Sequence, residues 1–267
     1  MQKKLIEEQS KERIVDKYPF IPISILKVKR HRKEQDLKKD RLITSGDKYY
    51  TNSSRAKFGN FDLEIGKFIL KYFNKIKGGS VLDVFAGWGE RGKITTDLGY
   101  DYFGFDISQN AINYAKEKYS ITINKADSRQ LPLDDKESID FSFTCPPYWK
   151  LEKYESCDGQ LTDINNYKSF LVELKKTIKE TYRVLKQESL CCWVVGDFRI
   201  KGKLYDYSTD IINLFNSCGF EIFDKIIIDK SINYRISMFL EQAERLGYTV
   251  KLHEYILVFK KKVDGNL

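Results

Sequence analysis

Histidine is scarce in this sequence, and cysteine lacks the pattern of a metal site. The 267 residues include two histidines, His31 and His253, and five cysteines without a Cys-x-x-Cys pair. A zinc site needs several such ligands at short spacing, so no metal centre is expected. The odd number of cysteines also favours free thiols over a disulfide framework.

Long apolar runs are missing as well. The longest, such as 190–195, fall far short of the ~20 residues that a membrane span requires. The start of the chain is rich in lysine and glutamate and has no signal-peptide apolar stretch. We therefore expect a cytoplasmic protein without a membrane partner.

Positive charge is present in excess. The formal net charge is +8, which suits a polyanionic partner such as DNA. Basic residues far outnumber acidic ones between residues 27 and 41. Within this segment, Arg30, Arg32 and Lys33 are predicted to contact DNA phosphates, and a solvated helix face is the alternative.

From about residue 79, apolar strand-like segments alternate with amphipathic helical ones. This alternation predicts an α/β fold with a doubly wound, mostly parallel, seven-stranded sheet. Residues 1–60 do not follow it and are interpreted as a basic N-terminal extension, with residues 61–267 as the domain. The expected strands are 80–85, 102–106, 121–125, 139–144, 190–195, 221–228 and 254–259, and the expected helices are 61–73, 90–98, 108–119, 166–185, 208–217 and 237–246.

A glycine turn follows the first expected strand. Gly87 and Gly89 in the segment VFAGWGERG allow the backbone to approach a ligand closely. Such a turn alone is also typical of a plain strand-to-helix connection. The second strand ends at Asp106, where ribose hydroxyls are bound in this topology, although a helix N-cap is the alternative. The predicted cofactor-binding residues are Asp83, Phe85, Ala86, Gly87, Gly89, Asp106, Ile107, Asp127 and Ser128.

Dinucleotide binding is the alternative function of a glycine turn followed by an acidic residue at the end of the second strand. The Phe-x-Gly-x-Gly form of residues 85–89 is one that methyltransferases favour. An oxidoreductase would also need a hydride-transfer site, and the sequence shows no motif for one.

The fourth expected strand runs directly into the segment TCPPYW, residues 144–149. Two prolines keep the backbone extended at the carboxyl end of a strand, where ligands bind in open α/β sheets; a simple turn is the alternative. The exocyclic amine of adenine or cytosine is a poor nucleophile. A rigid carbonyl at Pro146 would orient this amine by accepting a hydrogen bond from it. The predicted catalytic residues are Cys145, Pro146, Pro147 and Tyr148, and Thr144 and Trp149 are expected to bind the flipped base with Tyr148.

These motifs resemble those of the DNA amino-methyltransferases, which make N4-methylcytosine or N6-methyladenine. The segments that start at Cys145 (CPPYxxLExY), Val194 (VVGDxR) and His253 (HxxILVF) are similar to modification methylases of phages and mobile elements. The resemblance covers residue 58 to the end. It implies a Rossmann-like class I methyltransferase fold, S-adenosyl-L-methionine as cofactor, and site-specific methyl transfer to DNA, as in restriction-modification.

Cys145 departs from the family pattern, which has Asp, Asn or Ser at this position. The sequence Thr-Cys-Pro-Pro is closer to the Thr-Ser-Pro-Pro form of cytosine-N4 enzymes, so N4 of cytosine is favoured over N6 of adenine. C5-cytosine methylation needs a Pro-Cys pair, which the sequence lacks. An RNA amino-methyltransferase and a catalytically silent nucleic-acid-binding subunit remain alternatives.

No inserted domain separates the glycine turn from the Pro-Pro-Tyr segment, so the residues that recognise the target DNA sequence must lie elsewhere in the chain. The basic extension and residues 229–247 are the candidates, and a specificity partner or a homodimer is the further possibility. Asp197 and Arg199 are expected either to line the site or to form a surface ion pair. Tyr154 follows the catalytic loop and either shapes the base pocket or lies on the surface.

Overall fold

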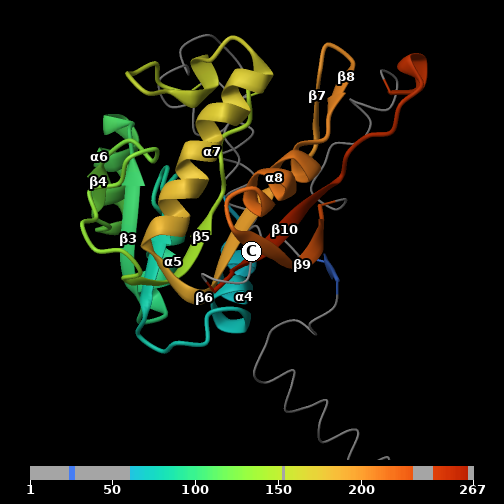
Figure 1. Ribbon diagram of the computed structural model, residues 1–267. Coiled ribbons are helices and arrows are strands. Elements are labelled where there is room, and N and C mark those ends of the chain that lie inside the picture. The colour runs from blue at the N-terminus through green and yellow to red at the C-terminus, as the bar shows by residue number, and fades with distance from the viewer. Residues whose placement is uncertain (1–23, 28–60, 152–153, 231–242, 264–267) are drawn as a thin grey trace, which may run out of the picture.

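An eight-stranded sheet forms the centre of the computed structural model, which describes residues 24–27, 61–151, 154–230 and 243–263 (Figure 1). The strand order is β1-β9-β10-β6-β5-β2-β3-β4. Strand β10 is antiparallel to both of its neighbours, and the other pairs are parallel. The strands are β1 (Ile25–Lys27), β2 (Ser80–Asp83), β3 (Asp101–Asp106), β4 (Ile123–Lys125), β5 (Ile139–Thr144), β6 (Leu185–Val195), β9 (Phe220–Asp229) and β10 (His253–Lys261).

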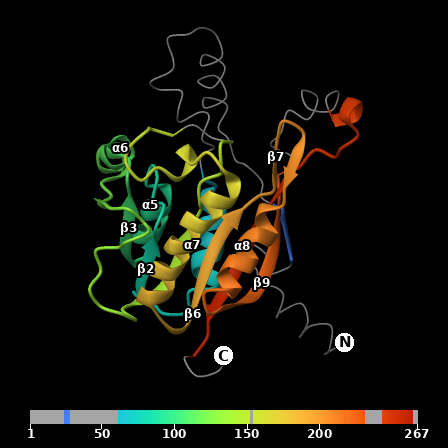
Figure 2. The same cartoon turned by 45° about the horizontal axis from the view of Figure 1, so that its top comes forward.

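Helices cover both faces of this sheet (Figures 1 and 2). Successive strand residues point to opposite faces, so Val81 packs with the α4 and α5 side and Leu82 with the α7 and α8 side. The two longest described helices each begin at an N-cap side chain: Ser108 caps α6 and Asn166 caps α7. The helices are α4 (Leu63–Tyr72), α5 (Glu90–Asp97), α6 (Gln109–Tyr119), α7 (Tyr167–Val184) and α8 (Tyr207–Asn216), with a 3-10 turn η2 (Leu161–Asp163).

The α/β class and the mostly parallel sheet predicted from the sequence are confirmed, and all seven expected strands are present. The eighth strand, β1, comes from the segment interpreted as an extension: Ile25–Lys27 pairs in parallel with β9. A hairpin of β7 (Phe198–Ile200) and β8 (Lys203–Tyr205) was not expected either. The domain boundary at residue 60 stays a prediction, and most of the expected helix 237–246 lies outside the described residues.

The sheet has its topological switch point between β2 and β5. The chain leaves β2 through α5 toward β3 on one side, while β5 pairs with β2 on the other. Ligands of open α/β sheets bind at the carboxyl ends of the strands at such a point. In the part of the chain that is described, no helix is long and apolar enough to cross a membrane.

Candidate active site

A cavity of about 860 Å³ opens at this switch point. Its volume lies within the ~300–1,000 Å³ that is usual for small-molecule sites. Six parts of the chain line it: Phe61 before α4, the turn after β2 with the start of α5, the end of β3 with α6, residues 126–128 after β4, residues 145–148 after β5, and the loop 154–161. The cavity therefore brings together the glycine turn with Asp106, which the sequence predicts to bind the cofactor, and residues 145–148, which it predicts to be catalytic.

Asp106 links the end of β3 to the glycine turn. Its Oδ2 accepts a hydrogen bond from Gly87 N at 2.8 Å, and its Oδ1 accepts one from Ser108 N at 2.9 Å. Burial raises the pKa of Asp106 above its usual value, although these two backbone hydrogen bonds partly offset the shift. Gly87 has the positive φ of 55° that this turn requires. Both residues line the cavity.

Gly89 has a packing role in the structure. A Cβ at this position would lie 2.6 Å from Ala115 Cβ, so the glycine allows the start of α5 to pack against α6. Gly89 does not line the cavity, and neither does the buried Ala86. Both positions are buried behind the turn, and their contact with the cofactor stays a prediction.

Asp83 lies beneath the cavity as part of a buried ion pair. Its Oδ2 accepts from Arg91 Nε at 2.8 Å, and its Oδ1 accepts from the Thr144 hydroxyl at 2.6 Å. Thr144 in turn accepts from Phe85 N at 3.2 Å. Burial lowers the pKa of the Arg91 guanidinium, but the adjacent Asp83 carboxylate outweighs this effect and the net shift is upward. Asp83 and Thr144 therefore connect the turn after β2 to the end of β5, and their contact with a ligand stays a prediction.

The segment after β5 presents Cys145, Pro146, Pro147 and Tyr148 to the cavity. The Tyr207 hydroxyl donates to the Pro147 carbonyl at 3.1 Å and thereby fixes the orientation of this peptide. The Tyr148 ring packs edge-on against Phe198, with ring centroids 5.7 Å apart.

Trp149 points away from the cavity. It is only 8% exposed, and its Nε1 donates to the Ile164 carbonyl at 2.8 Å. The aromatic face predicted for the base is therefore that of Tyr148 alone, because Trp149 belongs to the core.

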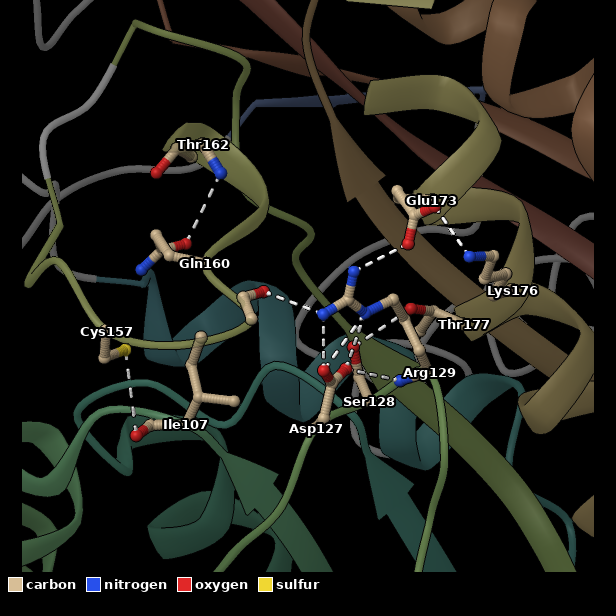
Figure 3. Close-up of polar contacts among 11 residues, drawn as sticks. Ile107, Asp127, Ser128, Arg129, Cys157, Gln160, Thr162, Glu173, Lys176 and Thr177 are labelled. Carbon is tan, nitrogen blue, oxygen red and sulfur yellow. Dashed lines mark hydrogen bonds and ion pairs between the residues drawn. The ribbon is translucent and has the colours of Figure 1, made fainter. Parts of the chain in front are cut away.

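Asp127 and Ser128 line the cavity, but both have partners within the protein (Figure 3). Arg129 donates from Nε to Asp127 Oδ1 at 2.9 Å and from Nη1 to Glu173 Oε2 at 2.6 Å. Ser128 Oγ lies 3.0 Å from Thr177 Oγ1. Burial raises the pKa of Asp127, but its hydrogen bonds to Arg129 outweigh this and hold the pKa below the usual value.

The loop 154–161 forms one wall of the cavity and is tied to the opposite side. Glu155 accepts hydrogen bonds from Ser108 Oγ at 2.7 Å and from Asn110 Nδ2 at 2.9 Å. The Gly159 carbonyl accepts from Arg129 Nη2 at 3.4 Å. Of this wall, the sequence had suggested only Tyr154, because its other members come from a loop without a motif.

The structure thus gathers most of the predicted site. Asp197 and Arg199 do not line the cavity and form no ion pair with each other within the described residues. Arg30, Arg32 and Lys33 lie outside the described residues. Predicted residues that line the cavity are Phe85, Gly87, Asp106, Ile107, Asp127, Ser128, Cys145, Pro146, Pro147 and Tyr148, and lining residues that sequence reasoning missed include Phe61, Trp88, Glu90, Asn110, Glu155 and Gln160.

Solved structures with the same arrangement include a SAM-dependent methyltransferase. A SAM-dependent methyltransferase of Methanosarcina mazei superimposes with a TM-score of 0.50 at 16% identity, covering 72% of this chain and 96% of that one. TrmN of Thermus thermophilus gives a TM-score of 0.50 at 14% identity, covering 80% and 52%. Residues 82–154 also match the methyltransferase domain family. The chain therefore has the Rossmann-like class I methyltransferase fold.

A narrower match distinguishes this chain within the class. Residues 139–265 match the N6/N4 family described as DNA methylase. The orphan methyltransferase M.BamHII of Bacillus amyloliquefaciens is 29% identical over 125 residues, which are 46% of this chain and 39% of the relative. The chain thus spans about two fifths of the length of that curated relative. The resemblance to DNA amino-methyltransferases inferred from the motifs is confirmed.

The matched families imply S-adenosyl-L-methionine as cofactor, as expected from the sequence. The cavity fits such a group. It combines the half-buried carboxylate of Asp106 with apolar walls at Phe85 and Ile107. A carboxylate acceptor at this place in the fold suits ribose hydroxyls. In the described residues, no group of histidine, cysteine and acidic side chains is arranged to hold a metal ion.

Proposed function

We propose that this protein is a DNA methyltransferase that uses S-adenosyl-L-methionine to methylate the exocyclic amine of a flipped base. One observation carries the proposal: the Pro-Pro-Tyr loop and the Asp106 turn line the same cavity. The DNA methylase match over residues 139–265 supports DNA as the partner. Assembly as a homodimer or with a specificity partner stays a prediction.

The protein residues have separate tasks in this reaction. When bound, the cofactor supplies an electrophilic methyl group on its sulfonium. Asp106 and the Gly87 backbone hold the ribose end, and the Pro146 carbonyl accepts a hydrogen bond from the target amine and so orients its nitrogen. Tyr148 offers its ring face to the flipped base.

The buried network of Asp83, Arg91 and Thr144 fixes the position of the glycine turn relative to the Pro-Pro-Tyr loop. Because it ties the turn after β2 to the end of β5, it sets the separation of the cofactor and base subsites. A misplacement of about 1 Å is enough to cost roughly 100-fold in rate.

We propose N4 of cytosine as the target in preference to N6 of adenine. Cys145 lines the cavity at the position before the two prolines. A thiol is a weak hydrogen-bond acceptor. Cys145 therefore leaves the orientation of the amine to the Pro146 carbonyl. Cys145 is also small and neutral, like the serine of the Thr-Ser-Pro-Pro form of cytosine-N4 enzymes.

The proposal is tested by transfer of labelled methyl groups from S-adenosyl-L-methionine to duplex DNA, followed by mass spectrometry of the nucleosides. We expect N4-methylcytosine in DNA and no label in an RNA duplex of the same sequence. Label in RNA alone would identify an RNA enzyme. No label in either, with cofactor binding absent by calorimetry, would identify a silent subunit.

Asp106 should make cofactor affinity sensitive to pH. Its carboxylate form is the acceptor, and its pKa is raised, so affinity is expected to fall on acidification at a higher pH than for an ordinary exposed aspartate. Asp106→Asn should weaken binding and flatten this profile, because the amide does not titrate. Calorimetric titration across pH measures both effects. An Asp106→Asn variant with unchanged affinity would refute the assignment to the ribose.

A further inference from the structure

The hairpin β7–β8 stands beside the mouth of the cavity. At its base, Phe198 packs against the cavity-lining Tyr148 with ring centroids 5.7 Å apart, and Tyr205 packs against the buried Trp149 with ring centroids 5.4 Å apart. In both overall views the hairpin rises from the end of the sheet that carries the cavity loops (Figures 1 and 2). Its tip therefore projects next to the position proposed for the flipped base.

The tip of this hairpin is a tight turn. Lys201 and Gly202 both have positive φ, 51° and 82°, and Ile200 pairs directly with Lys203. Two left-handed residues between paired strand ends form a type I′ turn, the tight turn that matches the twist of a hairpin. A Cβ added to Gly202 would meet nothing within 4 Å, so the turn stands in open space.

Three basic residues lie in or beside the turn at this tip: Arg199, Lys201 and Lys203. Lys201 and Lys203 are exposed, and no described carboxylate forms an ion pair with any of the three. Arg199 stacks its guanidinium 4.4 Å from the Tyr248 ring centroid and donates from Nη1 to the Gly202 carbonyl at 2.9 Å. Its Nε finds no hydrogen-bond partner among the described residues. None of the three charges is therefore neutralised by a described carboxylate, and Arg199 lies on the opposite face of the hairpin from Lys203.

We infer that the β7–β8 tip binds the DNA phosphate backbone beside the target base, an inference that rests on the proposed function. Lys201 lies three residues beyond Phe198, or ~10 Å at ~3.3 Å per strand residue. Phosphates follow one another by ~3.4 Å of helix axis along a strand, so the tip reaches about three base steps from the cavity mouth. Unpaired cations at that distance complement the backbone that flanks a flipped base.

The test compares two variants with equal loss of charge. The first combines Arg199→Gln, Lys201→Gln and Lys203→Gln. The control combines Lys71→Gln, Lys75→Gln and Lys77→Gln, three exposed lysines in the last turn of α4 and in the segment that leads to β2. Binding of a duplex DNA that the wild-type protein methylates is measured by fluorescence anisotropy from 50 to 200 mM salt.

Each lost phosphate contact should make the slope of log K against log salt shallower by ~0.9, so up to ~2.7 for the hairpin variant. Its KM for DNA should rise by more than its turnover number at saturating DNA falls, and its affinity for the cofactor should equal that of the wild type. The control variant should keep the wild-type slope to within about one contact.

A hairpin variant with the wild-type slope, or a control variant that loses as much, would overturn the inference. Failure of the proposed function has a separate signature, because it is the wild-type protein that would then transfer no methyl group to DNA. Methyl transfer by the wild type together with an unchanged slope in the hairpin variant would remove the hairpin inference alone.

Discussion

Replacement of Tyr148 by alanine is expected to lower methyl transfer to DNA by ~10- to 100-fold and to leave cofactor affinity nearly intact. A base stacked on an aromatic side chain gains about 1–3 kcal/mol, and each 1.4 kcal/mol corresponds to about a factor of ten. Tyr148 lines the cavity with its ring, which is braced from behind by Phe198 and Tyr207. Single-turnover transfer and calorimetry on the same preparation measure the two effects.

The matched variant is Tyr148→Phe, which retains the ring and removes only the hydroxyl group. Its transfer rate should stay close to that of the wild type if the ring face is what the base requires. Equal losses in both variants would assign the effect to the hydroxyl group instead. A Tyr148→Ala variant that lost cofactor affinity along with transfer would argue against a role confined to the base.

Asp83→Ala should destabilise the fold by about 3–5 kcal/mol, because it leaves the Arg91 guanidinium buried without its charge partner. The side chains of Asp83 and Arg91 are only 1% and 9% exposed. Urea denaturation measures this as a shift of the midpoint at constant m-value. The double variant Asp83→Ala with Arg91→Met should recover part of the loss, since it removes both charges.

Helix α5 supplies the control for this experiment. Lys93 and Asp97 form an ion pair one helical turn apart, with side chains 40% and 57% exposed. Asp97→Ala should cost only ~0.3–0.5 kcal/mol, since solvent screens the pair. If Asp83→Ala cost no more than Asp97→Ala, the buried network would not be what holds the two loops together.

The sequence predicted the sheet well, because buried parallel strands read as short apolar runs between helical segments. Edge strand β1 escaped detection because three residues, Ile25–Lys27, are too few to show a period. The hairpin escaped for a related reason: its two strands are equally short, and Arg199, Lys201 and Lys203 read as a solvated charged loop.

Within the site, position along the strands identified Asp106 and Cys145–Tyr148, but it does not reveal which way a side chain points. Tyr148 and Trp149 are neighbours of similar chemistry, yet one lines the cavity and the other is buried against η2 and α7. The role of Asp83 depends on Thr144, which is 61 residues away in the chain. Only the folded chain shows that contact.

The contact between Asp83, Arg91 and Thr144 also has an evolutionary consequence. The Asp83 carboxylate neutralises Arg91 and accepts a hydrogen bond from Thr144 at a largely buried place, so a change at one position leaves an unmatched group at the others. In related chains the three positions should therefore vary together. A hydrophobic residue in place of the aspartate should be accompanied by an uncharged residue in place of the arginine.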